Sequence, residues 1–337
     1  MSGMPDLRHD PLSDRWVIIA ENRAKRPQDF TAAGSRRTDR PCPFCRGHEG
    51  STPGEVLALR PEGSPADGPG WRVRVVPNKY PILQATAARG LPAGEKLFAS
   101  QPATGIHEVI IESPRHATRT SQLTTEELRE VILTYRHRLG VARRDDQLVY
   151  GLIFKNVGPQ AGATIEHLHS QMVGMSLLPT QTEQELRCAA AYYQSQRACI
   201  FCQMIEQECS QDTRVVARSD QFVAYCPYAS FSPYQTWITP RTHSSAFDEL
   251  SDAQAMELAA MLGKLLSQMD QVLDRPDYNY LVQSAPFDLT VHASYHWRVV
   301  VFPRITTWAG FEWATGCCIN PIAPEEAARQ LKFTSFL

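Results

Sequence analysis

The chain lacks both a long apolar segment and an excess of charge of one sign. Its 337 residues carry 34 Lys and Arg against 36 Asp and Glu, a formal net charge of −2. No apolar run approaches the roughly 20 residues that cross a bilayer, and residues 1–16 lack the apolar core of a secretion signal. A near-neutral charge gives no general attraction to nucleic acid or anionic membrane. We therefore expect a cytoplasmic globular protein with neither as a partner.

The cysteines have no secretory context. Nine are present, which without a signal points away from a disulfide framework and toward thiols or metal. Four of them form two pairs of the same C-x-F-C pattern, at 42–45 and 199–202. A short turn between two cysteines can present both thiolates to one zinc ion. The repetition of the pattern weakens the alternative of redox or coincidental pairs.

Each cysteine pair begins one copy of an internal repeat. In both copies an alternating, strand-like segment ends in a turn with a histidine, and a second histidine follows a later β-rich run. Each copy thus supplies two cysteines and two histidines, a complete tetrahedral zinc set. The two predicted sets are Cys42, Cys45, His116 and His167, and Cys199, Cys202, His243 and His296.

A helix is predicted at the same place in each copy. Thr124 with Glu127, and Ser251 with Gln254, have the pattern of a capping box, and apolar residues follow at helical spacing. We predict an α+β fold of two pseudo-repeats, with a largely antiparallel sheet and helices packed on it. The halves would be residues 1–176 and 177–337, joined by a helix within 177–198.

The segment IEHLHSQ holds a histidine that the metal does not need. If His167 binds zinc, His169 faces the same side of an extended strand and is surplus. Gly158 and Gly162 permit a tight loop whose N–H groups can cradle phosphate, beside which a histidine is a candidate nucleophile. The second copy has Arg298 at this position, so it cannot perform histidine chemistry.

These motifs carry a family resemblance. H-x-H-x-Q after a glycine-containing loop resembles the histidine triad superfamily of nucleotidyltransferases and hydrolases. Almost end to end, the chain is similar to the galactose-1-phosphate uridylyltransferase family within it. The similar segments, in order, are RHDPLSDRWVIIAENRAKRPQDF (8–30), CPFC (42–45), SPRH (113–116), FKNVG (154–158) and HLHSQ (167–171).

The resemblance implies a role for each site residue. His169 would form a covalent nucleotidyl-histidine, and Gln171 would hydrogen-bond the phosphoryl oxygens. The first Cys2His2 set would be a structural zinc site, and a homodimer would form. Phosphate and nucleotide would be bound by Arg23, Arg26, Asn78, Asn156 and Gly162, and the sugar by Phe311 and Glu312.

The resemblance leaves the substrates open. The family's Asn-Asp pair at the nucleoside pocket appears here as Asn78-Lys79, and a lysine and a glutamine for the sugar phosphate are replaced by Thr306 and Cys318. The tail at 309–331 looks more like the ADP-glucose phosphorylase relatives, whose acceptor is inorganic phosphate. We therefore expect transfer of UMP or AMP between a nucleoside-diphosphate sugar and either a hexose 1-phosphate or inorganic phosphate.

Two other functions compete with this prediction. A histidine triad hydrolase would deliver the same intermediate to water, and the sequence differs little for that outcome. A non-enzymatic zinc-stapled module that binds nucleic acid would also explain two C-x-x-C pairs. The near-neutral charge and the lack of clustered basic and aromatic residues argue against that module.

Overall fold

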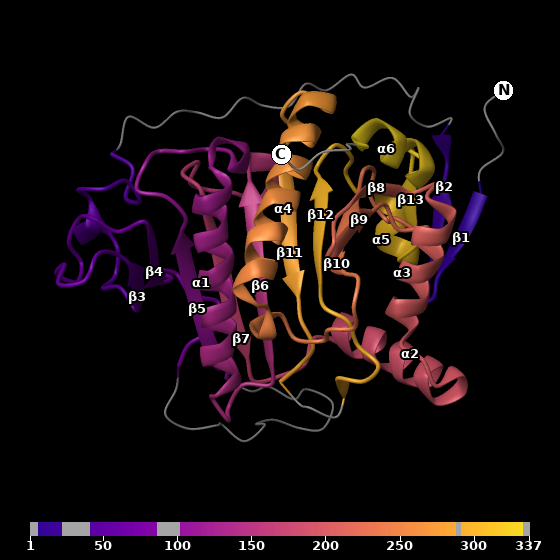
Figure 1. Ribbon diagram of the computed structural model, residues 1–337, viewed down its shortest axis with the longest axis horizontal. Coiled ribbons are helices and arrows are strands. Elements are labelled where there is room, and N and C mark those ends of the chain that lie inside the picture. The colour runs from indigo at the N-terminus through magenta and orange to yellow at the C-terminus, as the bar shows by residue number, and fades with distance from the viewer. Residues whose placement is uncertain (1–5, 22–40, 86–101, 288–290, 333–337) are drawn as a thin grey trace.

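A continuous antiparallel sheet spans both copies of the repeat (Figure 1). The computed structural model describes residues 6–21, 41–85, 102–287 and 291–332. The ten strands of this sheet, in spatial order, are β3 (Leu57–Leu59), β4 (Val73–Pro77), β5 (Gly105–Ile111), β7 (His169–Met175), β6 (Tyr150–Val157), β11 (Tyr278–Gln283), β12 (Arg298–Pro303), β10 (Thr236–Pro240), β9 (Phe222–Tyr225) and β8 (Val215–Arg218).

The strand order is symmetric about the central β6–β11 pair. Each half contributes five strands in the same internal order, so β7 of the first half corresponds to β12 of the second. Neighbouring strands of this sheet pair antiparallel throughout. The predicted α+β architecture of two pseudo-repeats on an antiparallel sheet is therefore confirmed.

Both predicted capping boxes are present. The Thr124 hydroxyl accepts the Glu127 N–H at 3.2 Å, and the Glu127 carboxylate accepts the Thr124 N–H at 2.8 Å. Ser251 and Gln254 make the matching pair of bonds at 3.1 and 2.9 Å. The described helices are α1 (Thr125–Arg143), α2 (Thr180–Gln196), α3 (Ile200–Gln211), α4 (Asp252–Val272), α5 (Gly310–Thr315) and α6 (Pro324–Leu331), with short 3-10 helices at 49–51, 120–122, 159–161 and 247–249.

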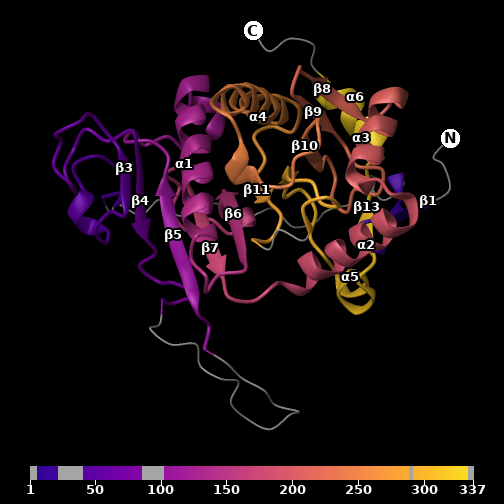
Figure 2. The same ribbon diagram turned by 60° about the horizontal axis from the view of Figure 1, so that its bottom comes forward.

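Different helices pack on the two faces of the sheet. Figure 2 shows α1 and α4 side by side, and their contacts with each other are extensive. Val299 and Val301 of β12 pack into the core that these two helices share, while Val300 points the other way into a cluster with Phe201 of α3. Side chains alternate along a strand, so α1 with α4 and α2 with α3 lie on opposite faces. The predicted connecting helix is α2.

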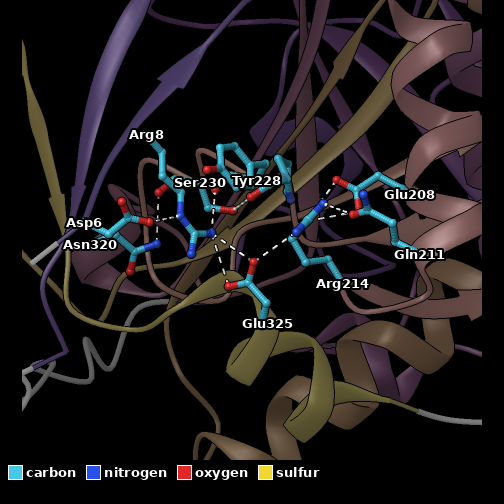
Figure 3. Close-up of polar contacts among 10 residues, drawn as sticks. Asp6, Arg8, Glu208, Gln211, Arg214, Tyr228, Ser230, Asn320 and Glu325 are labelled. Carbon is cyan, nitrogen blue, oxygen red and sulfur yellow. Dashed lines mark hydrogen bonds and ion pairs between the residues drawn. The ribbon is translucent and has the colours of Figure 1, made fainter. Parts of the chain in front are cut away.

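The start of the chain packs against the second half. A small sheet joins β1 (Asp6–Asp10), β2 (Arg15–Ile19) and β13 (Cys318–Asn320). Figure 3 shows Glu325 of α6 between two guanidinium groups, each 3.0 Å away, of Arg8 in β1 and Arg214 before β8. Both guanidinium groups also stack on the ring of Tyr228. This network fixes the β1–β2 hairpin at the end of the molecule away from β3 and β4 (Figure 1).

Within these described ranges, no helix combines the length and the apolar character of a membrane span.

Candidate active site

The first Cys2His2 set converges on one point. The donor atoms of Cys42, Cys45, His116 and His167 all lie within 4.8 Å of one another. Cys45 Sγ is 3.3 Å from His116 Nδ1 and 3.5 Å from His167 Nδ1, close to the separation of about 3.6 Å that tetrahedral zinc imposes on its sulfur and nitrogen ligands. Nε2 of His167 is 2.8 Å from the Ser113 carbonyl. A proton on Nε2 therefore leaves Nδ1 free for a metal.

The second set repeats this arrangement. Cys199, Cys202, His243 and His296 form the other described group able to hold a metal ion. Cys202 Sγ lies 3.3 Å from His243 Nδ1 and 3.7 Å from His296 Nδ1. The outward Nε2 of His296 is 3.0 Å from the Pro240 carbonyl, so both halves orient this ligand through a main-chain oxygen. Both groupings predicted from the repeat occur in the structure.

His169 is the first residue of β7, and its ring is held by the main chain two residues before it. Its Nδ1 is 2.8 Å from the His167 carbonyl, which can only accept, so Nδ1 carries the proton and Nε2 keeps its lone pair. The ring of Phe44, from the first cysteine turn, lies edge-on at 5.2 Å. Burial lowers the pKa of His169, and the positive charge of Lys155 on the opposite face of the sheet lowers it further. The imidazole is thus a neutral, oriented base or nucleophile.

A cavity of about 480 Å³ opens beside this histidine. Phe44, Val76 and Val109 give it apolar walls, while Asn78 and Gln171 line it together with His169. All the described residues that line it belong to the first half of the chain. The arrangement is typical of a pocket for an apolar ring that carries a polar, reacting end.

Other predicted residues lie outside this lining. Asn156 and Gly162 are neighbours, since a Cβ on Gly162, which has φ +86°, would be 3.8 Å from Asn156 Nδ2. Phe311 and Glu312 are on α5 in the second half, where Glu312 accepts the Ala309 N–H at 2.9 Å and caps its own helix. Arg23 and Arg26 lie outside the described residues.

Two groups of residues at the site were missed by the sequence reasoning. His107 of β5 is buried, with Nε2 2.8 Å from Gln171 Oε1. The sequence held one indication of this position: His107 lies two residues before Val109 in a strand, so both side chains point to the face of β5 that borders the site.

The second group lies behind His169, on the opposite face of the sheet. The Tyr135 hydroxyl of α1 is 2.8 Å from Glu112 and 2.7 Å from Ser170. Glu112 also forms an ion pair with the fully buried Lys155. This network ties α1 to the strand that carries His169, and no local sequence pattern reveals it.

The second half has a different residue at the corresponding point. Arg298 begins β12 as His169 begins β7. Its Nη2 is 2.8 Å from Glu185 of α2, and its guanidinium lies over the rings of Trp237 at 4.6 Å and Phe201 at 5.3 Å. An arginine held in this way cannot attack phosphorus, because it has no available lone pair.

Comparison with known proteins places the chain in a family. A family model described as galactose-1-phosphate uridyl transferase, N-terminal domain, matches residues 2–179, and one described as a domain of unknown function (DUF4921) matches residues 92–333. The ADP-glucose phosphorylase of Arabidopsis thaliana is 33% identical over 345 residues, covering 98% of this chain and 93% of that protein. The galactose-1-phosphate uridylyltransferase of Thermotoga maritima is 27% identical over 340 residues, covering 98% and 99%.

Solved structures agree with these matches. The crystal structure of the Arabidopsis thaliana ADP-glucose phosphorylase with bound ADP-glucose has a TM-score of 0.83 at 30% identity, covering 98% of this chain and 100% of that one. A uridylyltransferase structure has a TM-score of 0.75 at 25% identity, covering 98% of each chain. The chain therefore belongs to the galactose-1-phosphate uridylyltransferase family, and it is an enzyme of the nucleotidyltransferase class.

Proposed function

We propose that the protein transfers AMP from ADP-glucose to inorganic phosphate through a covalent nucleotidyl intermediate on His169. The observation that carries this proposal is the orientation of His169. Its Nδ1–H donates to the His167 carbonyl at 2.8 Å, so the nitrogen with the free lone pair is Nε2, on a ring that lines the cavity. A neutral, oriented imidazole in such a pocket is suited to nucleophilic attack.

The reaction proceeds in two displacements. Nε2 of His169 forms a bond to the α-phosphorus, and the bond from that phosphorus to the oxygen of glucose 1-phosphate breaks. An oxygen of inorganic phosphate then attacks the same phosphorus, the P–N bond breaks, and ADP leaves with the imidazole restored. Throughout, the proton stays on Nδ1 and is donated to the His167 carbonyl, a hydrogen bond that stabilises the positively charged ring of the intermediate. Gln171 supplies a hydrogen-bond donor to the phosphoryl oxygens.

Zinc is the ion that both Cys2His2 sets would hold. Two thiolates and two imidazoles in a closed tetrahedron are the donors of a structural zinc site, which leaves no position for substrate. An ion on His167 would stiffen the strand that supplies His169, two residues away. Zinc would therefore orient the nucleophile, while the phosphoryl charge would be met by protein groups.

The choice of nucleotide and acceptor rests on the comparisons and on two departures from the family. The ADP-glucose phosphorylase is the more similar of the two relatives, at 33% against 27% identity. Thr306 and Cys318 stand where a hexose 1-phosphate acceptor would meet a lysine and a glutamine, which inorganic phosphate does not need. UMP transfer to hexose 1-phosphate is the second candidate, because the Thermotoga maritima uridylyltransferase matches over 99% of its length.

The two halves would have different roles in a homodimer. Residues 1–176 would be catalytic and residues 177–337 would support them and bind the sugar. Phe311 and Glu312 do not line their own chain's cavity, and Phe311 and Trp313 expose aromatic surface on α5, as a subunit contact would. We propose that these residues, with Arg23 and Arg26, serve the partner's site. We also propose that the protein, whose nine cysteines form no disulfide, works in the cytoplasm.

Intact-protein mass spectrometry tests this function. Wild-type protein and His169→Ala are incubated briefly with ADP-glucose or UDP-glucose. We expect an AMP-sized adduct on wild type alone, which inorganic phosphate discharges as ADP. A UMP-sized adduct would identify the uridylyltransferase alternative, and nucleotide release without any acceptor would identify a hydrolase. An adduct that persists in His169→Ala would refute the assigned nucleophile.

A further inference from the structure

The hydrogen-bond network around Gln171 begins at two main-chain donors. The Tyr80 N–H donates to Asn78 Oδ1 at 2.9 Å, and the Ile82 N–H donates to His107 Nδ1 at 3.1 Å. A main-chain N–H can only donate, so these two bonds decide which atoms of Asn78 and His107 are acceptors. The orientation of the Asn78 amide and the tautomer of His107 follow from the backbone.

Both side chains then direct donors at the same oxygen. With Nδ1 accepting, a neutral His107 carries its proton on Nε2, which lies 2.8 Å from Gln171 Oε1. With Oδ1 accepting, Asn78 presents its Nδ2 to the same Oε1 at 3.3 Å, and the two donor nitrogens that share this oxygen lie 3.1 Å apart. If the Gln171 amide were reversed, its NH2 group would face two donors. The Gln171 oxygen is therefore held at the wall, and its NH2 group is left for the cavity.

The surroundings of His107 favour the neutral form of its imidazole. Its exposed fraction is 7%, and burial lowers its pKa although the bond to Gln171 opposes the shift. A second proton on Nδ1 would point at the Ile82 N–H, and two donors cannot bond each other. His107 thus enters the network as an acceptor at one nitrogen and a donor at the other.

We propose that His107 is a positioning residue of the transfer reaction, which fixes the Gln171 amide with its NH2 group toward the phosphoryl oxygens. Gln171 has one donor end and one acceptor end, and only the donor end can stabilise the charge that builds on those oxygens. An amide free to rotate would offer its oxygen part of the time and repel that charge. This inference rests on the proposed nucleotidyl transfer at His169.

Single-turnover formation of the nucleotidyl-enzyme from ADP-glucose tests the role. His107→Leu removes the donor, whereas His107→Gln can place an amide N–H near the position of Nε2. We expect His107→Leu to slow adduct formation about tenfold or more with little change in the ADP-glucose concentration for half-saturation. His107→Gln should recover most of the rate. His137→Leu, on the exposed side of α1, is the matched control and should form the adduct like wild type.

A double-mutant cycle separates positioning from general damage. Once Gln171→Ala has removed the amide, His107→Leu should cost less than twofold more, because the two residues act as one unit. Full additivity of the two losses would overturn the proposal. So would adduct formation at the wild-type rate in His107→Leu.

A second measurement does not depend on turnover. Nitrogen NMR of the wild-type imidazoles, with His107 assigned by its loss in His107→Gln, should show a neutral ring with a bare Nδ1. A charged ring or a proton on Nδ1 would overturn the proposed positioning. If wild type formed no nucleotidyl adduct while the NMR result held, the proposed function would have failed and the network geometry would stand.

Discussion

The two halves of the molecule share a frame and differ in the group that the frame presents. Each has a C-x-F-C turn, two histidines that complete a tetrahedral donor set, and a strand that begins two residues after the second histidine. The phenylalanine of the turn packs on the first side chain of that strand in both halves, Phe44 on His169 and Phe201 on Arg298. The same arrangement in both halves thus positions one side chain, and the identity of that side chain decides whether chemistry can occur.

The surroundings of this position also differ. The cavity beside His169 measures about 480 Å³, whereas the one beside Arg298 measures about 240 Å³. Glu185 of α2 pairs with Arg298, and the β1–β2 hairpin supplies His9 and Arg15 to the wall of the smaller cavity. In the second half, α2 and the β1–β2 hairpin therefore occupy part of the space that the first half leaves open.

The second half also supports the first directly. Asn279 of β11 donates to Asn156 Oδ1 at 2.8 Å and to the Ala161 carbonyl at 2.9 Å. Asp277, just before β11, accepts the Gln160 N–H at 2.6 Å. These bonds cross the central strand pair and hold the glycine loop that leads to His169. The repeat has thus diverged into a half that reacts and a half that holds the reacting loop.

The largest effect should come from the one position that distinguishes the halves. His169→Ala should abolish the nucleotidyl adduct and lower turnover by more than about a thousandfold, because no other group replaces the nucleophile. The matched change in the other half, Arg298→His, should not create a second adduct, since the cavity there is half as large and holds the Glu185 carboxylate, which would repel a phosphate group. Mass spectrometry gives the stoichiometry. Two adducts per chain would show that the frame alone is sufficient for reaction.

Removal of the buried arginine should affect folding more than chemistry. Arg298→Met leaves Glu185 buried without its partner and should lower the free energy of unfolding by about 3–5 kcal/mol. Arg298→Met combined with Glu185→Leu should recover most of that loss, because the orphaned charge is gone. Denaturant unfolding measures both. If the double variant were as unstable as the single one, the Arg298–Glu185 pair would stabilise the fold through more than the neutralisation of each other's charge.

Loss of metal should affect catalysis when it occurs in the first half and stability when it occurs in the second. Cys45→Ser should empty the first site and slow adduct formation about 10- to 100-fold, because the strand bearing His169 loses its anchor. Cys202→Ser should empty the second site and lower the midpoint of thermal unfolding, with adduct formation by the folded protein within a few-fold of wild type. Metal analysis confirms which site is lost. Equal kinetic effects of the two changes would contradict a division of labour between the halves.

The features that could be predicted from the sequence are those that depend on short motifs or on the repeat. The Cys2His2 groupings, both capping boxes and the connecting helix follow from short motifs and their repetition. The contact of His107 with Gln171 does not, because it depends on β5 lying beside β7 and on the register that pairs Val109 with Gln171. The support of Asn156 by Asn279 likewise requires the β6–β11 pair, which joins segments from different halves. Neither His107 nor Asn279 belongs to a recognisable motif.

The smallest effect should be equal in the two halves. Thr124→Ala and Ser251→Ala each remove the side-chain acceptor at the start of an equivalent helix, α1 or α4, and each should lower the free energy of unfolding by about 1 kcal/mol. Both helices cover the face of the sheet opposite His169, so neither change should alter adduct formation. Chemical denaturation and single-turnover kinetics measure the two quantities separately.

A kinetic loss in Thr124→Ala alone would reveal coupling from α1 to the site. The path exists, since the Tyr135 hydroxyl of α1 contacts Ser170, the neighbour of His169, at 2.7 Å. Tyr135 lies three turns from the helix start, however, and the loss of a cap frays mainly the first turn. An equal and purely thermodynamic response of both caps would therefore show that the halves differ only on the face of the sheet where His169 and Arg298 lie.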